Sequence, residues 1–351
     1  MSHLTALRRG RIASAAIPAI ALAVAGLMAA APGAQAAVRT PAAPAAPALH
    51  GHRISLGTTS NVFGDAFTEA PNGAVFFSRG SVVYVVEGNQ APAIALHAGD
   101  PVLALAANSA DLFVQTGLRV TEYSRSDGAH VRHWTLTSPV TPVTSAGLYA
   151  VGSTVWSWTD WATDESGFEY ATISRIHTSS PAVHVVDTSA YPADMSADSA
   201  GLYFETQHGA NGYLGHANPA SSTVRLRKAP VDAPLALAHG RVDELASGST
   251  SEHLYSYNAS TLAFVSAKKV PEKDAAIAGT GLGLLVLAQG CNGFPCSAAT
   301  VGKLNVSTGG TWGALPTPGG YQLLTGPSAA VVEVSDVHGT HADMFLVRIS
   351  A

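Results

Sequence analysis

A strand–turn–strand unit recurs seven times along the chain, and this repeat limits the possible folds more than any single residue does. Each copy has an apolar strand, a polar turn rich in Ser, Thr, Asn or Gly, and a second strand. The turns begin at or beside Glu87, Ser124, His177, Asn218, Asn258, Asn305 and Ser350. Successive turns are 37 to 53 residues apart. Propeller blades of four strands repeat at roughly 40–50 residues, so the spacing predicts a β-propeller.

The predicted strands are rich in Val, Leu, Tyr and Phe and are bounded by Gly, Pro and Asn, as in residues 81–86 and 111–115. After the first 36 residues, no stretch keeps a helical period with capping residues at its ends. A typical blade is predicted with strands over 234–238, 241–247, 253–258 and 262–270. A His239-Gly240 turn joins its first two strands.

The two chain ends predict how the ring closes. The last blade supplies only three strands, over 322–325, 331–335 and 344–349, whereas residues 53–57 form an extra strand before the first full blade. A closed ring leaves no sheet edge open, so these two ends should pair. The predicted fold is all-β, a seven-bladed β-propeller closed by an N-terminal strand that completes the last blade.

The repeated units resemble blades of secreted seven-bladed β-propellers of the quinoprotein-like or YVTN-like kind. In those families the third strand runs into a short polar turn, as residues Tyr123–Gly128 do here. The resemblance covers residues 50–351 and implies a ring of blades with its function on loops. The WD dipeptide of WD40 repeats is absent from the chain, and no residue pattern marks a quinone site.

The first 36 residues have the pattern of a signal peptide. Arg8, Arg9 and Arg11 precede an uncharged apolar run over 12–28, and Ala34-Gln35-Ala36 is an A-x-A cleavage signal. A retained membrane anchor is the alternative. Residues 37–49 form a Pro/Ala-rich linker, which leaves 50–351 as the propeller domain. No later segment is apolar enough to span a membrane, so we expect a secreted, extracellular bacterial protein.

Charge limits the partners of the mature chain. Removing the three arginines of the leader leaves 16 basic and 24 acidic residues, a net charge of −8. A surface of that sign repels phosphate backbones, and no run of Lys and Arg is interleaved with aromatic residues. We therefore expect no nucleic acid among the partners.

The only two cysteines, Cys291 and Cys296, lie close together in the sequence. In an exported chain such a pair predicts one disulfide across a loop tip. A redox site is the alternative, although redox sites normally show C-x-x-C and four residues intervene here.

The loops that join second and third strands should all emerge on one face of the ring, and function in such scaffolds sits on loops. The blade-three loop combines Trp161 with Asp160, Asp164 and Glu165, and the blade-four loop carries His208. An aromatic ring beside acids suits sugar stacking or cation binding; a solvated acidic hairpin is the alternative. Two further tryptophans, 156 and 158, share one strand face and are expected in the core.

The blade-seven loop carries His338 and His341, flanked by Asp336 and Asp343. Imidazole and carboxylate ligands suit zinc or a similar divalent cation. On a tight hairpin, however, two histidines three residues apart need not converge, so a polar turn is the alternative. No other cofactor is evident from the sequence.

These observations predict a secreted, monomeric propeller that binds an extracellular glycan or protein through one loop face. The alternative is an extracellular metal-assisted lyase or hydrolase on the same face, similar in architecture to streptogramin lyases. A purely structural envelope protein is a third hypothesis. The chain has no G-x-S-x-G, P-loop, H-E-x-x-H or dinucleotide motif. The enzyme hypothesis requires the blade-seven histidines to face the central channel.

Overall fold

The structure is a computed structural model. It describes residues 48–351 except 61–64, 138–142, 144–145, 164–168, 209–210, 222, 231–232, 248–250, 272–274, 290–298, 308, 318–319 and 339–340. Within strands, the side chains of 160–163, 169–170, 189–194, 207–208, 289, 321 and 335–338 are also not described. The predicted signal peptide, over 1–36, lies outside the described residues, as does most of the predicted linker. Residues Ala46–Ala351 form one compact unit.

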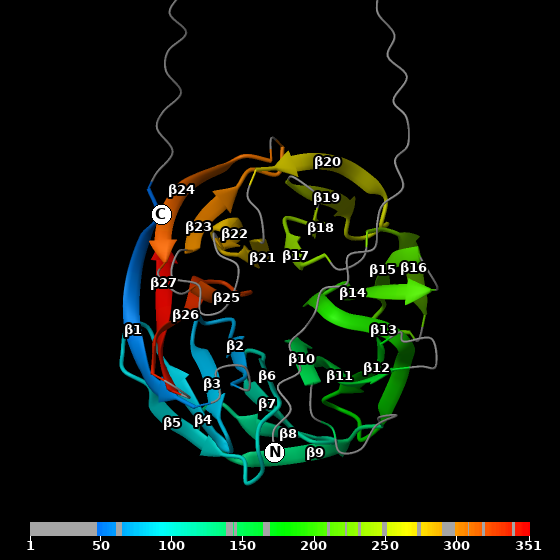
Figure 1. Cartoon of the computed structure of the whole chain (residues 1–351). Coiled ribbons are helices and arrows are strands. Elements are labelled where there is room, and N and C mark those ends of the chain that lie inside the picture. The colour runs from blue at the N-terminus through cyan, green and yellow to red at the C-terminus, as the bar shows by residue number, and fades with distance from the viewer. Residues whose placement is uncertain are drawn as a thin grey trace, which may run out of the picture. The chain divides into compact units, whose positions relative to one another are not determined.

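The described residues form 27 strands and no α-helix, and the strands make seven four-stranded blades (Figure 1). Blade 1 contains β2 (Phe67–Glu69), β3 (Val75–Arg79), β4 (Val82–Val86) and β5 (Ala93–His97). Blade 2 contains β6 (Ala104–Ala107), β7 (Asp111–Thr116), β8 (Arg119–Ser124) and β9 (His130–Thr135). Blades 3 and 4 together contain β10 (Ala146–Val151), β11 (Thr154–Thr163), β12 (Glu169–His177), β13 (Val183–Asp198), β14 (Gly201–His208), β15 (Asn211–Ala217) and β16 (Val224–Lys228).

Blade 5 contains β17 (Leu235–Ala238), β18 (Arg241–Ser247), β19 (Glu252–Asn258) and β20 (Phe264–Val270). Blade 6 contains β21 (Ala275–Thr280), β22 (Gly283–Gln289), β23 (Ala299–Leu304) and β24 (Thr311–Thr317). Blade 7 contains β25 (Gly320–Leu324), β26 (Ala329–His338), β27 (His341–Ser350) and β1 (His50–Thr59). The predicted seven-bladed propeller is therefore confirmed.

Blades 3 and 4 share one strand. β13 is 16 residues long; its first part pairs with β12 as the outer strand of blade 3. Its last part, Met195–Asp198, pairs with β14 as the inner strand of blade 4. The two blades therefore form one continuous seven-stranded sheet, whereas each other blade is a separate four-stranded sheet.

The polar turns that define the repeat end the third strands, as predicted. In four of them the backbone N–H of the first turn residue donates to the carbonyl five residues later, at Ser124, Asn218, Asn258 and Asn305. Each of the three Asn side chains accepts a further backbone N–H within its turn, at 2.7 to 3.0 Å. Asparagine favours this local bonding over a continued ladder, which is why the turns are readable from the sequence.

The predicted blade over 234–270 is observed as β17–β20, with one difference at the start of the outer strand. His239 and Gly240 both have positive φ, 51° and 73°, and form the tight turn between the first two strands. Leu262 also has positive φ, 56°, and its N–H donates to the Asn258 carbonyl at 2.8 Å. Leu262 therefore closes the turn, and the outer strand begins two residues later than predicted.

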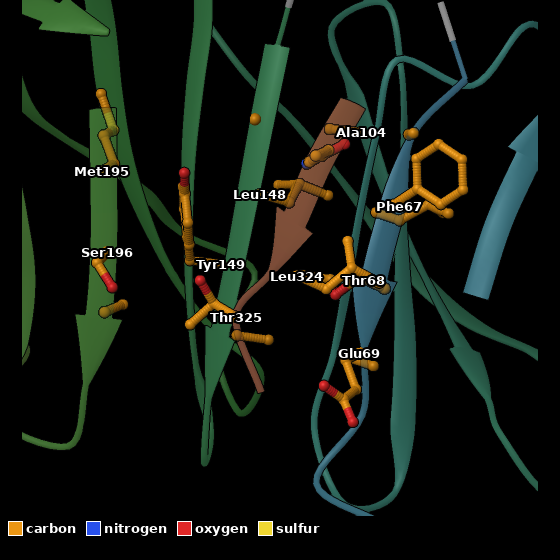
Figure 2. Close-up of a pocket in the computed structure, with 18 of the residues that line it drawn as sticks. Phe67, Thr68, Glu69, Ala104, Leu148, Tyr149, Met195, Ser196, Leu324 and Thr325 are labelled. Carbon is orange, nitrogen blue, oxygen red and sulfur yellow. The ribbon is translucent and has the colours of Figure 1, made fainter. Parts of the chain in front are cut away.

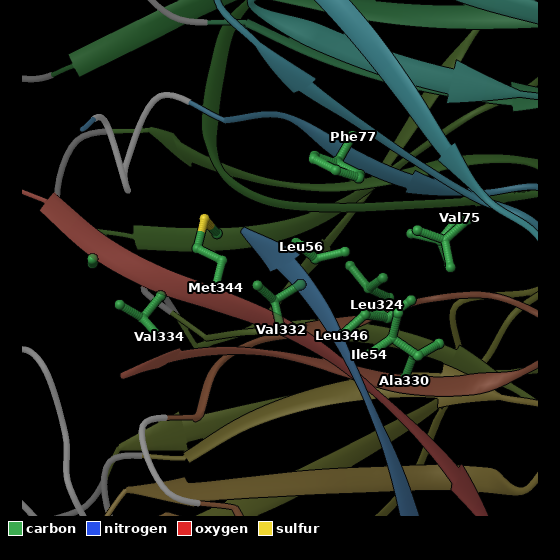
Figure 3. Close-up of a cluster of buried hydrophobic side chains, with 12 residues drawn as sticks. Ile54, Leu56, Val75, Phe77, Leu324, Ala330, Val332, Val334, Met344 and Leu346 are labelled. Carbon is green, nitrogen blue, oxygen red and sulfur yellow. The ribbon is translucent and has the colours of Figure 1, made fainter. Parts of the chain in front are cut away.

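The ring is closed by antiparallel pairing of β1 with β27, which confirms the prediction for the chain ends. Arg53 lies opposite Val347, and Ile54 lies opposite Leu346. Figure 3 shows Ile54 and Leu56 packed with apolar residues of β26 and β27 and with Val75 and Phe77 of blade 1. The closing strand is therefore fixed by side-chain packing as well as by its backbone hydrogen bonds.

A polar network joins blade 7 to blade 1 beside this apolar cluster. The Arg348 guanidinium donates to the carbonyls of Gly88 (2.6 Å) and Val86 (3.2 Å) and to Ser328 Oγ (3.1 Å). The Ser328 N–H donates to Glu69 Oε1 at 2.9 Å, and the Ser328 hydroxyl also donates to that oxygen. Arg348 thus links both ends of the ring through one side chain.

We expect Arg348→Ala to lower the free energy of unfolding by about 2 kcal/mol, because it removes charge-assisted hydrogen bonds across the closure. Equilibrium denaturation in urea, followed by tryptophan fluorescence, measures the change. Lys269→Ala on the exposed strand β20 is the control, with an expected change within about 0.5 kcal/mol. Equal stabilities for the two variants would contradict this role for Arg348.

Several carboxyl groups are buried among the blades. Burial raises the pKa of Glu244 to about 8, and an interaction with the Tyr257 hydroxyl offsets only part of this shift. Burial likewise raises the pKa of neighbouring Asp243 to about 6, although the Ser256 hydroxyl donates to it. Because the native state favours the protonated groups, their contribution to stability is fully present below the ordinary carboxyl pKa. It is lost as pH rises through about 6 for Asp243 and about 8 for Glu244.

The free energy of unfolding should therefore fall as pH rises from about 5 to about 9. In Glu244→Gln the part of this fall that belongs to Glu244, on the order of 3 kcal/mol, should disappear. Urea denaturation at several pH values measures both slopes. Glu87→Gln, in an exposed turn, should keep the slope of the unchanged protein. A Glu244→Gln slope equal to that of the unchanged protein would refute the assignment.

Candidate functional site

The inner strands of all seven blades surround a central cavity of about 580 Å³. The cavity is bordered by β2, β6, β10, the end of β13, β17, β21 and β25. Figure 2 shows Phe67, Leu148, Met195 and Leu324 at its wall together with the polar side chains Thr68, Ser196 and Thr325. Each of these strands is the innermost strand of its blade, so its backbone lies beside the channel. The cavity wall therefore combines apolar side chains with side-chain hydroxyl groups.

The two ends of the cavity differ in their charged groups. Strand β2 is followed by the turn to β3, so Glu69 lies at the end of the channel on the side of that turn. Asp65 precedes β2 and lies at the opposite end, near Arg79, where β3 turns into β4. The second-to-third-strand loops lie at this same end. Asp65 therefore marks the end of the channel at the loop face, which is the face predicted to bind a ligand.

Burial and two neighbouring residues, Thr59 and Arg79, together set the pKa of Asp65. Burial raises its pKa to about 6, and a hydrogen bond with Thr59 and the positive charge of Arg79 act in the opposite direction. Arg79 is held in place because its Nη2 donates to the Gly57 carbonyl at 3.1 Å and its guanidinium carbon lies 5.5 Å from the Phe77 ring centroid. A carboxyl group with this pKa changes charge near neutral pH, which is unusual for an aspartate.

The predicted blade-seven residues lie on the β26–β27 hairpin. The backbones of His338 and His341 are opposite each other at its end, and Asp343 Oδ1 accepts the Thr58 hydroxyl at 2.8 Å. His341 and Asp343 do not line the central cavity. Among the described residues no three potential ligands gather into a metal cluster. The Asp336 and His338 side chains are not described, so the metal site stays a prediction.

The predicted residues of blades 3 and 4 are placed only in part. Asp160 and Trp161 lie near the end of β11, and His208 ends β14 opposite Asn211. The side chains of these three are not described, and Asp164 and Glu165 lie outside the described residues. So do Cys291 and Cys296, which leaves the disulfide a prediction. Trp156 is buried in an apolar cluster, as expected for a core residue; Trp158 packs against the same cluster but is only partly buried and also lines the central cavity.

The sequence interpretation missed the charged groups at the end of the channel. Asp65, Thr59 and Arg79 come from three different segments, and none belongs to a long loop. One signal was available: Asp65 stands directly before the first inner strand of blade 1. In a propeller that position opens onto the channel, so each residue there is a candidate for lining it.

Comparison with solved structures agrees with this architecture. The WD40 domain of Neurospora crassa Pan2 is similar with a TM-score of 0.55 at 9% identity, over 84% of this chain and 95% of that one. The β-propeller domain of Myceliophteria thermophila Cps50 (Swd1) gives 0.56 at 11% identity, over 84% and 99%. Kuenenia stuttgartiensis hydrazine synthase gives 0.52 at 14%, over 76% and 91%. No protein-family model and no curated protein matches the chain. At these identities the likeness shows the fold alone.

We expect Arg79→Ala to raise the pKa of Asp65 above about 6, since it removes the cation that favours the charged carboxylate. Carboxyl-carbon NMR of protein labelled at aspartate measures the titration. Arg119→Ala, in the next blade, is the control and should leave the Asp65 titration in place. A lower Asp65 pKa in Arg79→Ala would contradict the arrangement.

Proposed function

We propose that this protein is a secreted binding module that holds an extracellular glycan or protein on the face of the second-to-third-strand loops. The seven-bladed propeller fits an interaction module, because a rigid ring presents many loops side by side. The secreted location is proposed from the leader pattern over 1–36 and the cleavage signal at Ala34-Gln35-Ala36.

The observation that carries this proposal is the unequal length of the hairpins on the loop face. The inner strands of neighbouring blades run parallel, as a parallel bridge between Thr280 and Gly326 illustrates for blades 6 and 7. Equivalent loops therefore share a face. The second and third strands have 10 and 9 residues in blade 3 and 10 each in blade 7, but only 5 each in blade 1. The hairpins with the predicted aromatic and acidic residues are thus the longer ones.

A binding module is favoured over the metal-assisted lyase or hydrolase by the position of the blade-seven hairpin. The enzyme hypothesis needs its histidines at the central channel, but His341 and Asp343 lie away from the cavity wall. Among the residues that the structure describes, Asp65 lines the end of the cavity nearest the loops, and Arg79 lies close to it. A carboxylate beside a guanidinium suits the orientation of a polar ligand, and a glycan hydroxyl or a peptide group would provide the complementary atoms.

The test is a binding screen of the chain from Ala37 against a glycan array and a panel of purified extracellular proteins. We expect Trp161→Ala to weaken binding of the best ligand at least about tenfold, because a tryptophan at the centre of a binding surface contributes about 2 kcal/mol or more. Ser179→Ala, in the exposed turn between β12 and β13 on the opposite face, is the control and should bind normally. Equal loss in both variants, or none in Trp161→Ala, would exclude the loop face as the binding surface.

A further inference from the structure

Strand β16 differs from the other outer strands in the regularity of its pairing. All five of its residues pair with β15 in unbroken register, from Val224 opposite Ala217 to Lys228 opposite Tyr213. The pairings of the other six outer strands, β1, β5, β9, the first part of β13, β20 and β24, each contain a bulge or irregularity. Bulges are one way in which proteins protect an exposed sheet edge from pairing with another chain. Among the described pairings, β16 alone lacks this protection.

The hydrogen bonds at the two ends of β16 show which backbone groups face outward. The Asn218 N–H donates to the Thr223 carbonyl (3.4 Å), and the Ala229 N–H donates to the Gly212 carbonyl (3.1 Å). In an antiparallel ladder the groups alternate, so Arg225 and Arg227 turn their backbone groups to β15. Leu226 and Lys228 turn theirs away from the blade. Since β16 is the last strand of its sheet, these groups lie at an open edge at the rim of the ring (Figure 1).

The side chains of this edge are cationic and exposed. Arg225, Leu226, Arg227 and Lys228 are all exposed, with Leu226 at 45%. Arg225 is held by contacts that its Nη2 makes with the Ser260 carbonyl (2.9 Å) and His216 Nδ1 (2.8 Å), which keeps its side chain on the side of blade 5. Arg227, two residues along the strand, lies on the same face, and Leu226 and Lys228 lie on the other.

This charge differs in sign from the chain as a whole. The mature sequence is predicted to carry a net charge of −8, yet three of the five residues of β16 are cations and none is acidic. The next outer strand along the chain, β20, adds Lys268 and Lys269 and also has no acid. The positive charge of the rim at blades 4 and 5 is therefore a local feature, with charge complementary to an acidic partner.

We propose that β16 is a docking edge for an extended acidic segment of a partner protein, which adds to blade 4 as a fifth, antiparallel strand. Backbone groups of Leu226 and Lys228 would form the hydrogen bonds to the added strand, as in other β-strand additions. The residues opposite Arg225 and Arg227 are then non-hydrogen-bonded pairs, whose side chains approach most closely. Acidic residues at these two positions, with an apolar residue between them opposite Leu226, complement the edge.

The same charges argue against a second copy of this chain as the occupant. If two β16 strands paired antiparallel with Leu226 opposite its own copy, Arg225 of each strand would lie opposite Arg227 of the other. Like charges directly opposite are destabilising in a sheet, and charged edge strands are a common means of preventing self-association. The charges of β16 therefore favour pairing with an acidic strand and disfavour pairing with β16 of a second copy of this chain. This surface lies on the rim, and the proposal does not depend on the loop-face function.

The test uses the full mature chain and a labelled synthetic peptide of about seven residues that alternates glutamate and valine. Fluorescence anisotropy measures binding, and hydrogen exchange followed by NMR reports on single amides. We expect the peptide to bind and to slow exchange at Leu226 and Lys228, whose N–H groups face outward in the free protein. A lysine–valine peptide and a peptide of the same composition with its glutamates contiguous should bind at least about tenfold more weakly.

Two variants separate strand addition from simple charge attraction. Leu226→Pro removes an outward-facing N–H and no ladder hydrogen bond, so the fold should persist while binding falls at least about tenfold. Arg227→Glu should also lose about tenfold or more and gain affinity for the lysine–valine peptide. Thermal unfolding of both variants close to that of the unchanged protein verifies that the loss is local. If Leu226→Pro were unfolded, Leu226→N-methyl-leucine made by chemical ligation would remove the same donor.

Several results would overturn the proposal. The proposal is wrong if the acidic peptide fails to bind, or if it binds with no protection at Leu226 and Lys228. Normal peptide binding by Leu226→Pro would show that the edge backbone is not used. Concentration-dependent self-association that Leu226→Pro abolishes would identify a second copy as the occupant. Loss of loop-face binding in Trp161→Ala has no bearing on these outcomes, so the two proposals fail independently.

Discussion

The structure depends on the pairing of β1 with β27. A ring of blades has no sequence-local way to join its first and last members, so two segments nearly 300 residues apart must meet, as Arg53 and Val347 do. Backbone hydrogen bonds alone add little net stability because water competes for the same groups. The apolar side chains of β1, packed on blade 1 and blade 7, stabilise the closure more, since burial of apolar surface drives folding. Arg348 adds hydrogen bonds of defined geometry between blade 7 and blade 1, because its guanidinium donates to two carbonyls of blade 1.

The same closure fixes the geometry of the site. Asp65 lies between the closing strand, through Thr59, and the second strand of blade 1, through Arg79. Its pKa near 6 follows from a position that is partly desolvated but still beside a cation. The carboxyl at the end of the channel is thus a product of how the chain ends meet. In an open ring Asp65 would lack its contact with Thr59 of the closing strand.

Much of the fold was predictable, because the turns are specified by local sequence and the number of strands in each blade can be counted. The asparagine turns at 218, 258 and 305 bond to their own backbone, so the turn is specified by the residue itself. The missing strand of the last blade could be counted from the sequence. The start of the outer strand at Phe264 was not predictable, because it depends on a positive φ at Leu262, which sequence patterns do not reveal for a leucine. The charged end of the channel was also missed, because Thr59, Asp65 and Arg79 are brought together by the tertiary fold.

The sharing of β13 by two blades bears on how the ring comes apart. The other blades form separate sheets, and apolar clusters pack neighbouring blades against each other. Between blades 3 and 4 the strand β13 belongs to both blades, and Ala190 pairs with Ala171 of blade 3 and with Thr206 of blade 4. Because β13 belongs to both blades, opening either blade exposes one side of a strand that the other blade also uses. These two blades should therefore exchange, unfold and refold as one cooperative unit, about twice the size of the units in the rest of the ring.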